Sequence, residues 1–152
     1  MRFKKQLLVI GSLATAIVCL AAPAMAAVDP VEKDGKGVAV KGYDVVAYFT
    51  QSKPVKGTPQ FTHQWNGATW QFASAADRDL FAADPAKYAP QYGGYCAYGV
   101  SQNHAVPIDP EAWRIIEGKL YLNYSKSVQK AWLEDPAKRI EEANRNWPGL
   151  HK

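Results

Sequence analysis

The organisation of this chain follows from one stretch, NGATWQFASAADRDLFAADPAKY at residues 66–88, which recurs in altered form as EGKLYLNYSKSVQKAWLEDPAKR at residues 117–139. The second occurrence lies 51 positions after the first, and the two align without a gap. Their identities fall on a glycine, a serine and an Asp-Pro-Ala-Lys run, which are residues that form turns, start helices and stop helices. The pattern predicts an internal duplication, with halves at approximately residues 41–90 and 92–140.

The first half is expected to form a β-hairpin followed by a helix. Aromatic and polar residues alternate over residues 60–65, as in a strand, and Asn66-Gly67 is a strong hairpin signal before a second strand through residue 72. Ser74 is placed to cap a helix over residues 75–83. Asp84-Pro85 should stop this helix, because the residue before a proline is pushed out of the helical conformation. Its inner face is expected to carry Leu80 and Phe81.

The second half repeats this plan, with strands expected at residues 113–116 and 120–123 and Ser125 as the next cap. A further helix is predicted from Pro136 to Asn146, closed by Trp147-Pro148. Neither unit can bury its apolar face alone, so the two should share a core. The predicted fold class is therefore α+β: a small single domain of two related β-hairpin-plus-helix units with a C-terminal helix.

Residues 1–26 have the features of a secretory signal peptide, because basic residues precede an apolar run that ends in Ala24-Met25-Ala26. The apolar run, residues 7–22, is shorter than the roughly 18 to 20 residues that cross a bilayer, which disfavours an uncleaved anchor. A lipoprotein site at Cys19 is disfavoured because Val18 stands where a small residue is needed. We therefore expect a periplasmic or secreted domain at residues 27–152, with no stable membrane span after cleavage.

Charge and length limit the possible functions of this exported chain. Removing residues 1–26 takes away three of the 18 basic residues and none of the 14 acidic ones, so a net charge of about +1 remains. No basic stripe of the kind that binds nucleic acid is present, so DNA and RNA are not expected partners. The remaining chain of about 126 residues suits one domain with a core of ordinary size.

Cysteine usage singles out one residue, because Cys96 is the only cysteine left once Cys19 is removed with the signal peptide. It therefore cannot form a disulfide within the mature chain. A lone cysteine can be a small buried hydrophobic residue. The alternatives are a metal ligand, a redox-active thiol and an intermolecular bridge, and the residues alone leave all four open.

Cys96 lies in the most unusual part of the chain, YGGYCAYGVSQNH at residues 92–104, which we interpret as a tight glycine-rich loop. His104 is eight positions from Cys96, within reach across such a loop. Thiolate and imidazole together suit Cu(I) or Zn(II). His63 on the first hairpin is a possible third ligand or a half-exposed strand residue, whereas His151 is expected to fray in the terminal tail.

Five short motifs bear on the family of the chain: WNGATWQFAS at residues 65–74, DPAKY at 84–88, GYDVVAYF at 42–49, YGGYCAYGV at 92–100 and LYLNYS at 120–125. In these motifs the chain resembles the YHS domain family, and more closely its exported bacterial members, over about 110 residues. The resemblance implies a small α+β module related to the metal-binding modules of copper and silver pumps. Copper, less so zinc, is the implied cofactor.

The chain departs from the metal-binding relatives at their ligand positions. In the first half these positions correspond to Val46, Ala73 and Asp77, none of which is a soft ligand. In the second half Cys96 matches the early cysteine and Tyr124 the strand-to-helix junction. The resemblance therefore implies a metal site at Cys96, with Tyr124 joining the ligands already considered, His104 and His63.

Three function classes remain open, with an enzyme the less expected. The first binds a soft metal near Cys96, with a metal ion or a periplasmic protein as partner. The second is a thiol-based redox protein or enzyme, with Cys96 as nucleophile, His104 as base and Asp109 as an orienting group. The third is a non-catalytic domain that binds a partner or ligand through an aromatic loop containing Tyr92, Tyr95 and Tyr98.

Overall fold

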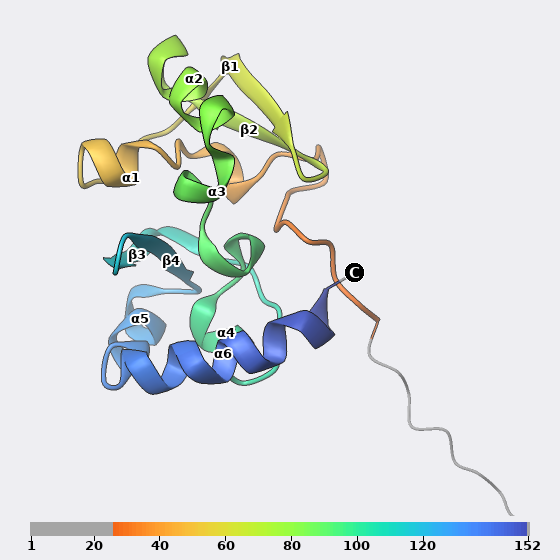
Figure 1. Cartoon of the computed structure of the whole chain (residues 1–152), viewed down its shortest axis with the longest axis vertical. Helices are drawn as coiled ribbons and strands as arrows, with labels where there is room; N and C mark the ends of the chain where they lie inside the picture. The colour runs from red at the N-terminus through yellow and green to blue at the C-terminus, as the bar shows by residue number, and fades with distance from the viewer. Residues whose placement is uncertain (1–25, 152) are drawn as a thin grey trace, which may run out of the picture.

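The computed structural model describes residues 26–151, so the signal peptide expected at residues 1–26 lies, except for Ala26, outside the described residues. The described chain is a small α+β domain with two antiparallel hairpins and several helices (Figure 1). No helix within residues 26–151 is long and apolar enough to cross a membrane. In order, the elements are η1 (Val40–Gly42), α1 (Ala47–Thr50), β1 (Thr58–Trp65), β2 (Ala68–Phe72), α2 (Ala75–Ala83), α3 (Pro85–Tyr88), η2 (Gln91–Gly94), α4 (Ala97–Ser101), β3 (Asp109–Ile116), β4 (Lys119–Asn123), α5 (Lys126–Trp132) and α6 (Pro136–Leu150).

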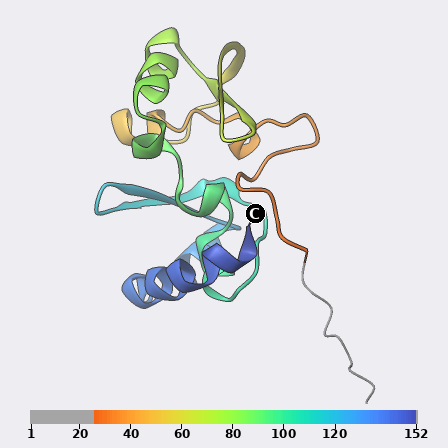
Figure 2. The ribbon, with the colours of Figure 1, turned by 45° about the vertical axis from the view of Figure 1, so that its right-hand side comes forward.

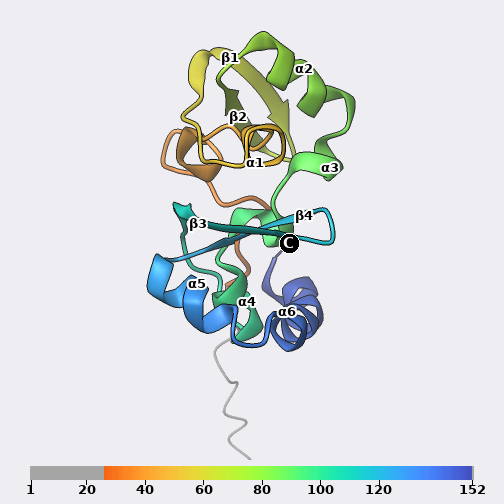
Figure 3. The ribbon, with the colours of Figure 1, turned by 90° about the vertical axis from the view of Figure 1, so that its left-hand side faces the viewer.

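The two hairpins are built alike and lie in different halves of the molecule. The β1–β2 hairpin lies with α1, α2 and α3 at one end, and the β3–β4 hairpin lies with α4, α5 and α6 at the other (Figures 1 and 3). Both strands of the second hairpin begin and end 51 residues after their counterparts. The register shifts once in each, between Thr58 and Thr62 and between Asp109 and Trp113, which are again equivalent positions.

The turns and caps repeat with the same spacing. Asn66-Gly67 and Glu117-Gly118 both have positive φ angles, as a tight hairpin turn between twisted strands requires. Ser74 and Ser125 each accept a hydrogen bond from the backbone N–H three residues on, at 3.1 and 3.2 Å. These contacts confirm both predicted hairpins and both predicted serine caps.

A second correspondence, at a spacing of 52, precedes each hairpin. Residues 40–42 have φ angles of 50, 53 and 76°, and residues 92–94 have 57, 61 and 87°. A short helix follows each left-handed run, α1 in the first half and α4 in the second. Residues 92–104, which the glycine content suggested to be a tight loop, begin with this left-handed run and contain the five-residue helix α4 (Ala97–Ser101), which the interpretation as a loop did not include.

The core joins the two halves. One buried cluster contains Trp70 and Phe72 from the first half together with Cys96 and Leu122 from the second. The hydroxyl of Tyr48 on α1 donates to the carbonyl of Pro110 at 2.8 Å, and its ring lies 5.2 Å from that of Trp113. The two units therefore bury each other, as the sequence predicts.

Two expectations about apolar side chains turn out differently. Phe81 is fully buried against Trp70 and Phe72, but Leu80 is 43% exposed because it lies on the outer face of α2. The C-terminal helix continues through Pro148 to Leu150 instead of closing at Trp147. Its end is held by a hydrogen bond from Val28 N to the carbonyl of Leu150, at 2.8 Å.

His151 is ordered against the fold, so the expectation that it frays was wrong. Its ring stacks on Trp147, with centroids 4.2 Å apart and planes at 14°. Val28, near the other end of the described chain, pairs with His151 in a parallel bridge. The N-terminal segment therefore runs beside the C-terminal end of α6 (Figure 2).

Candidate functional site

Cys96 is a buried helix cap. Its side chain is 1% exposed, and it precedes the first residue of α4. Sγ accepts hydrogen bonds from Gly99 N at 3.3 Å and from Tyr124 N at 3.2 Å, and Asn123 Oδ1 lies 3.7 Å away. Burial raises the pKa of the thiol, and the backbone N–H groups oppose that rise. The thiol form is therefore favoured at neutral pH, which disfavours a nucleophilic role.

Asp44 occupies the equivalent place in the first half. Its Oδ1 accepts from Val46 N and Ala47 N at 2.9 and 3.3 Å, and its Oδ2 accepts from Ala73 N at 2.9 Å. Ala73 precedes Tyr124 by 51 residues, and Asp44 precedes Cys96 by 52. Each side chain therefore joins the start of a short helix to the strand-to-helix junction. The counterpart of Cys96 is Asp44 and not Val46, the position that the family resemblance suggested.

Asp44 lies in an environment that disfavours the charged form of its carboxyl group. It is fully buried, and burial raises its pKa to about 6, with a further contribution from Asp77 on α2. In the second half, a thiol and Val128 stand at these two positions, so no such carboxyl pair forms there. The two halves thus share a backbone bracing contact but differ in its chemistry.

The other residues expected to bind a metal together with Cys96 lie in different parts of the fold. Tyr124 contributes its backbone N–H, while its side chain is 57% exposed. His104 is exposed, and its backbone N–H donates to Gly99 O at 2.8 Å. His63 lies on β1 in the other half, where its ring makes an edge contact with Phe81 at 5.9 Å.

Few side chains that could coordinate a metal ion therefore lie close to Cys96. Within residues 26–151, no three His, Cys, Asp or Glu side chains come together in a group that could hold a metal ion. Close to the thiol lies one side-chain oxygen, that of Asn123, which also accepts from Tyr98 N at 3.2 Å. The Nδ2 atom of Asn123 is buried without a hydrogen-bond partner among the described residues.

The tyrosines expected to form an exposed platform pack against α6 instead. Tyr92 is buried, and its hydroxyl donates to Asn144 Oδ1 at 3.0 Å. Tyr95 lies with its ring centroid 5.9 Å from that of Trp147. The guanidinium of Arg139 covers the ring of Tyr98 at 5.0 Å. These tyrosines therefore help to position α6.

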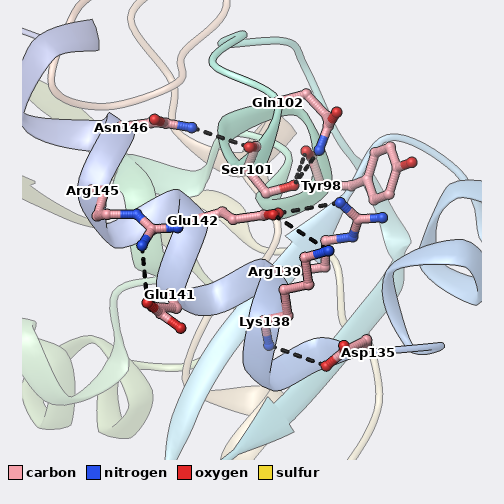
Figure 4. Close-up of polar contacts among 10 residues, drawn as sticks. All are labelled: Tyr98, Ser101, Gln102, Asp135, Lys138, Arg139, Glu141, Glu142, Arg145 and Asn146. Atoms are coloured by element: carbon pink, nitrogen blue, oxygen red, sulfur yellow. Dashed lines mark hydrogen bonds and ion pairs between the residues drawn. The ribbon is translucent and has the colours of Figure 1, made fainter.

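Polar contacts complete the attachment of α6 to α4 (Figure 4). Asn146 Nδ2 donates to the carbonyls of Val100 and Ser101, at 2.9 and 3.0 Å. Arg139, besides covering Tyr98, donates to Glu142 Oε2 at 3.1 Å. The Asn146 contacts hold the end of α6, and with it Trp147, against α4.

Between the halves lies a pocket of about 140 Å³. Four separate parts of the chain meet there: the N-terminal segment, the first hairpin, the connection between α3 and η2, and the end of α6. Its lining contains Pro30, Val31, Trp65, Asn66, Trp70, Ala89, Pro90, Gly93, Trp147 and His151.

Three tryptophans line this inter-half pocket. The rings of Trp65 and Trp70 lie 5.8 Å apart, and Trp147 stacks on His151, which also lines the pocket. The indole of Trp70 donates to the carbonyl of Trp65 at 3.0 Å, which fixes its orientation. Trp147 and His151 come from residues far along the chain, and no sequence motif indicated that they would join the first hairpin.

The chain matches no protein-family profile, no curated protein and no solved structure.

Proposed function

We propose that the protein is an exported, non-catalytic binding module that takes a small organic cation in the inter-half pocket. The observation that carries this proposal is the convergence of three indole rings, those of Trp65, Trp70 and Trp147, on one pocket. A cavity of about 150 Å³ accepts a molecule as large as benzene, so the pocket has room for a compact ligand of that size.

The chemistry of the lining favours a cation over an anion. Indole faces attract ammonium groups, most strongly where water is excluded. The pocket lining, as far as residues 26–151 describe it, includes no Lys or Arg that would hold an anion. Next to the lining residue Val31 stands Glu32, whose Oε2 is buried without a partner among the described residues.

The test compares choline with its neutral isostere 3,3-dimethylbutan-1-ol in tryptophan fluorescence titrations of residues 27–152. We expect saturable binding of choline and much weaker binding of the alcohol. Trp147→Leu should weaken choline binding by about 3- to 30-fold, because one cation–π contact contributes roughly 0.5 to 2 kcal/mol.

Trp113→Leu is the matched control, since it removes an indole that contacts Tyr48 outside the pocket. Equal affinity for choline and the alcohol would show that charge is not recognised. Equal effects of the two tryptophan substitutions would place binding elsewhere.

A second candidate function is soft-metal binding at Cys96, and the observation that favours it is the pair of backbone N–H groups directed at Sγ. Such donors stabilise the thiolate, the form of cysteine that binds metals. The resemblance to YHS modules points to the same residue. Copper(I) is the preferred ion for this proposal, because it accepts few, soft ligands.

Anaerobic Cu(I) titration against a chromogenic chelator tests this second candidate. We expect stoichiometric competition by the intact protein and its loss in Cys96→Ser, which keeps a hydrogen-bond acceptor but removes the soft ligand. His104→Ala and Tyr124→Phe would then show whether either side chain contributes. Failure of the intact protein to compete would reject metal binding and leave the cation proposal untouched.

A further inference from the structure

The second half carries a groove of its own, with a volume of about 280 Å³. It lies between the β3–β4 turn and the first turns of α6. Its lining consists of Ile116, Glu117, Pro136, Ala137 and Ile140. We call this the α6 groove.

The α6 groove has a counterpart in the first half. Ile116, Glu117 and Ile140 lie 51 residues after Trp65, Asn66 and Ala89, which all line the inter-half pocket. Both halves therefore have a hollow beside the hairpin turn, and three of its lining residues are at equivalent positions.

In the first half, the chain itself lines this hollow with a segment that bends at Pro30 and Val31. Val31 is buried, and Glu32 N donates to Gly93 O at 2.9 Å. The carbonyl of Pro30 lies so close to Gly93 that a Cβ atom there would collide with it. Two residues after Val31, Lys33 Nζ donates to the carbonyl of the turn residue Gly67 at 3.0 Å.

The segment in the first half thus shows which peptide chemistry suits such a hollow. It bends at a proline and an aliphatic residue and, two positions later, places a lysine on the hairpin turn. A proline lowers the entropy that such a segment loses on binding. The α6 groove is likewise lined by apolar side chains. At its hairpin turn, Glu117 stands in the position of Asn66, which adds a negative charge where the lysine would lie.

We propose that the α6 groove binds a segment of a partner protein with the pattern Pro-aliphatic-x-Lys/Arg. Proline and the aliphatic side chain contact Ile116 and Ile140, and the basic side chain reaches Glu117 and the carbonyl of Gly118. In the first half the chain supplies this segment itself; in the second half no segment among residues 26–151 lines the groove from outside the hairpin and α6. This proposal does not depend on the cation site.

The experiment uses residues 27–152 and a fluorescein-labelled peptide, AVDPVEK, that copies residues 27–33. Fluorescence anisotropy should show saturable binding. Ile140→Ser should weaken it at least about tenfold, because it removes most of an aliphatic side chain from the contact. Leu80→Ser is the matched control, since it removes an exposed aliphatic residue from a helix of the other half and should change nothing.

A charge exchange tests the orientation of the peptide at an exposed position that folding does not depend on. Glu117→Lys should weaken binding of AVDPVEK, and the peptide AVDPVEE should bind the Glu117→Lys protein better than the original protein. This variant also decides the question if Ile140→Ser fails to fold.

Four results would overturn the proposal. The first is the absence of saturable binding, and the second is equal binding by the Ile140→Ser and Leu80→Ser proteins. The third is displacement of the peptide by choline, which would place it in the inter-half pocket. Concentration-dependent self-association abolished by Ile140→Ser would also reject a foreign segment, since the occupant would then be a second copy of this chain.

Discussion

The thiol of Cys96 and the carboxylate of Asp44 have the same structural role in their two halves. Both side chains accept hydrogen bonds from the backbone N–H groups of a short helix and of a strand-to-helix junction. Cysteine is a weaker acceptor than a carboxylate but avoids burying a charge. Cys96 therefore makes the same kind of hydrogen bonds between helix and junction without the electrostatic cost of a buried carboxylate, which Asp44 carries.

Removing the acceptor at position 96 should destabilise the protein. Cys96→Ala leaves the N–H groups of Gly99 and Tyr124 without a partner, so we expect the free energy of unfolding to fall by about 1 to 3 kcal/mol. Cys96→Ser should lose less, because its hydroxyl can accept the same bonds. Urea denaturation of the three proteins measures this, and an alanine variant as stable as the original would contradict the bracing role.

Asp44 should make stability depend on pH. Its pKa is raised from an ordinary value of 3.8 to about 6 in the folded state, so protonation stabilises the fold. That contribution is complete below 3.8 and is lost as pH rises through about 6. Relative to Asp44→Asn, the original protein should therefore lose unfolding free energy across this range. Parallel pH profiles of the two proteins in urea denaturation would refute the assignment.

The two hairpin-plus-helix units allow an internal comparison at the level of elements. Ser74 and Ser125 cap α2 and α5 with nearly identical distances. Each change to alanine should cost about 0.5 to 2 kcal/mol, and the two costs should be similar because the geometry is the same. Thermal or urea denaturation of both variants gives the values; a large difference would mean that the surroundings, and not the cap, set the cost.

Local signals explain why these elements could be predicted. Gly67 and Gly118 adopt the left-handed turn that their position in the sequence suggested, and the serine caps and Asp-Pro stops act within a few residues. The run at residues 40–42 could not be predicted in this way, because a β-branched residue such as Val40 rarely adopts a positive φ and does so here under tertiary constraint. Leu80 faces solvent because α2 turns its Phe81 side toward the core.

The candidate site was predictable only in part, for the same reason. Cys96 was identified because it is the only cysteine after residue 26, but its partners are backbone N–H groups at Gly99 and Tyr124, which no residue type reveals. The inter-half pocket depends on Val31 meeting Trp147 across more than a hundred residues of sequence. Such meetings are set by the packing of the whole chain.

At the scale of the molecule, the shared core should make unfolding a single event. Tyr48 of the first half bonds to Pro110 of the second, and one apolar cluster contains side chains from both. Tryptophan fluorescence and far-UV circular dichroism should therefore follow the same denaturation curve. Tyr48→Phe should lower stability by about 1 kcal/mol without separating the curves. Two distinct transitions would mean that the halves fold independently.

The pairing of Val28 with His151 places the two ends of the described chain side by side. The main-chain hydrogen bond from Val28 to Leu150 brings the start of the described chain to its end. A short linker could join the two, and new ends could be opened in an exposed loop such as residues 51–53. The N-terminal segment and α1 would then be synthesised last instead of first, while their contacts stayed the same.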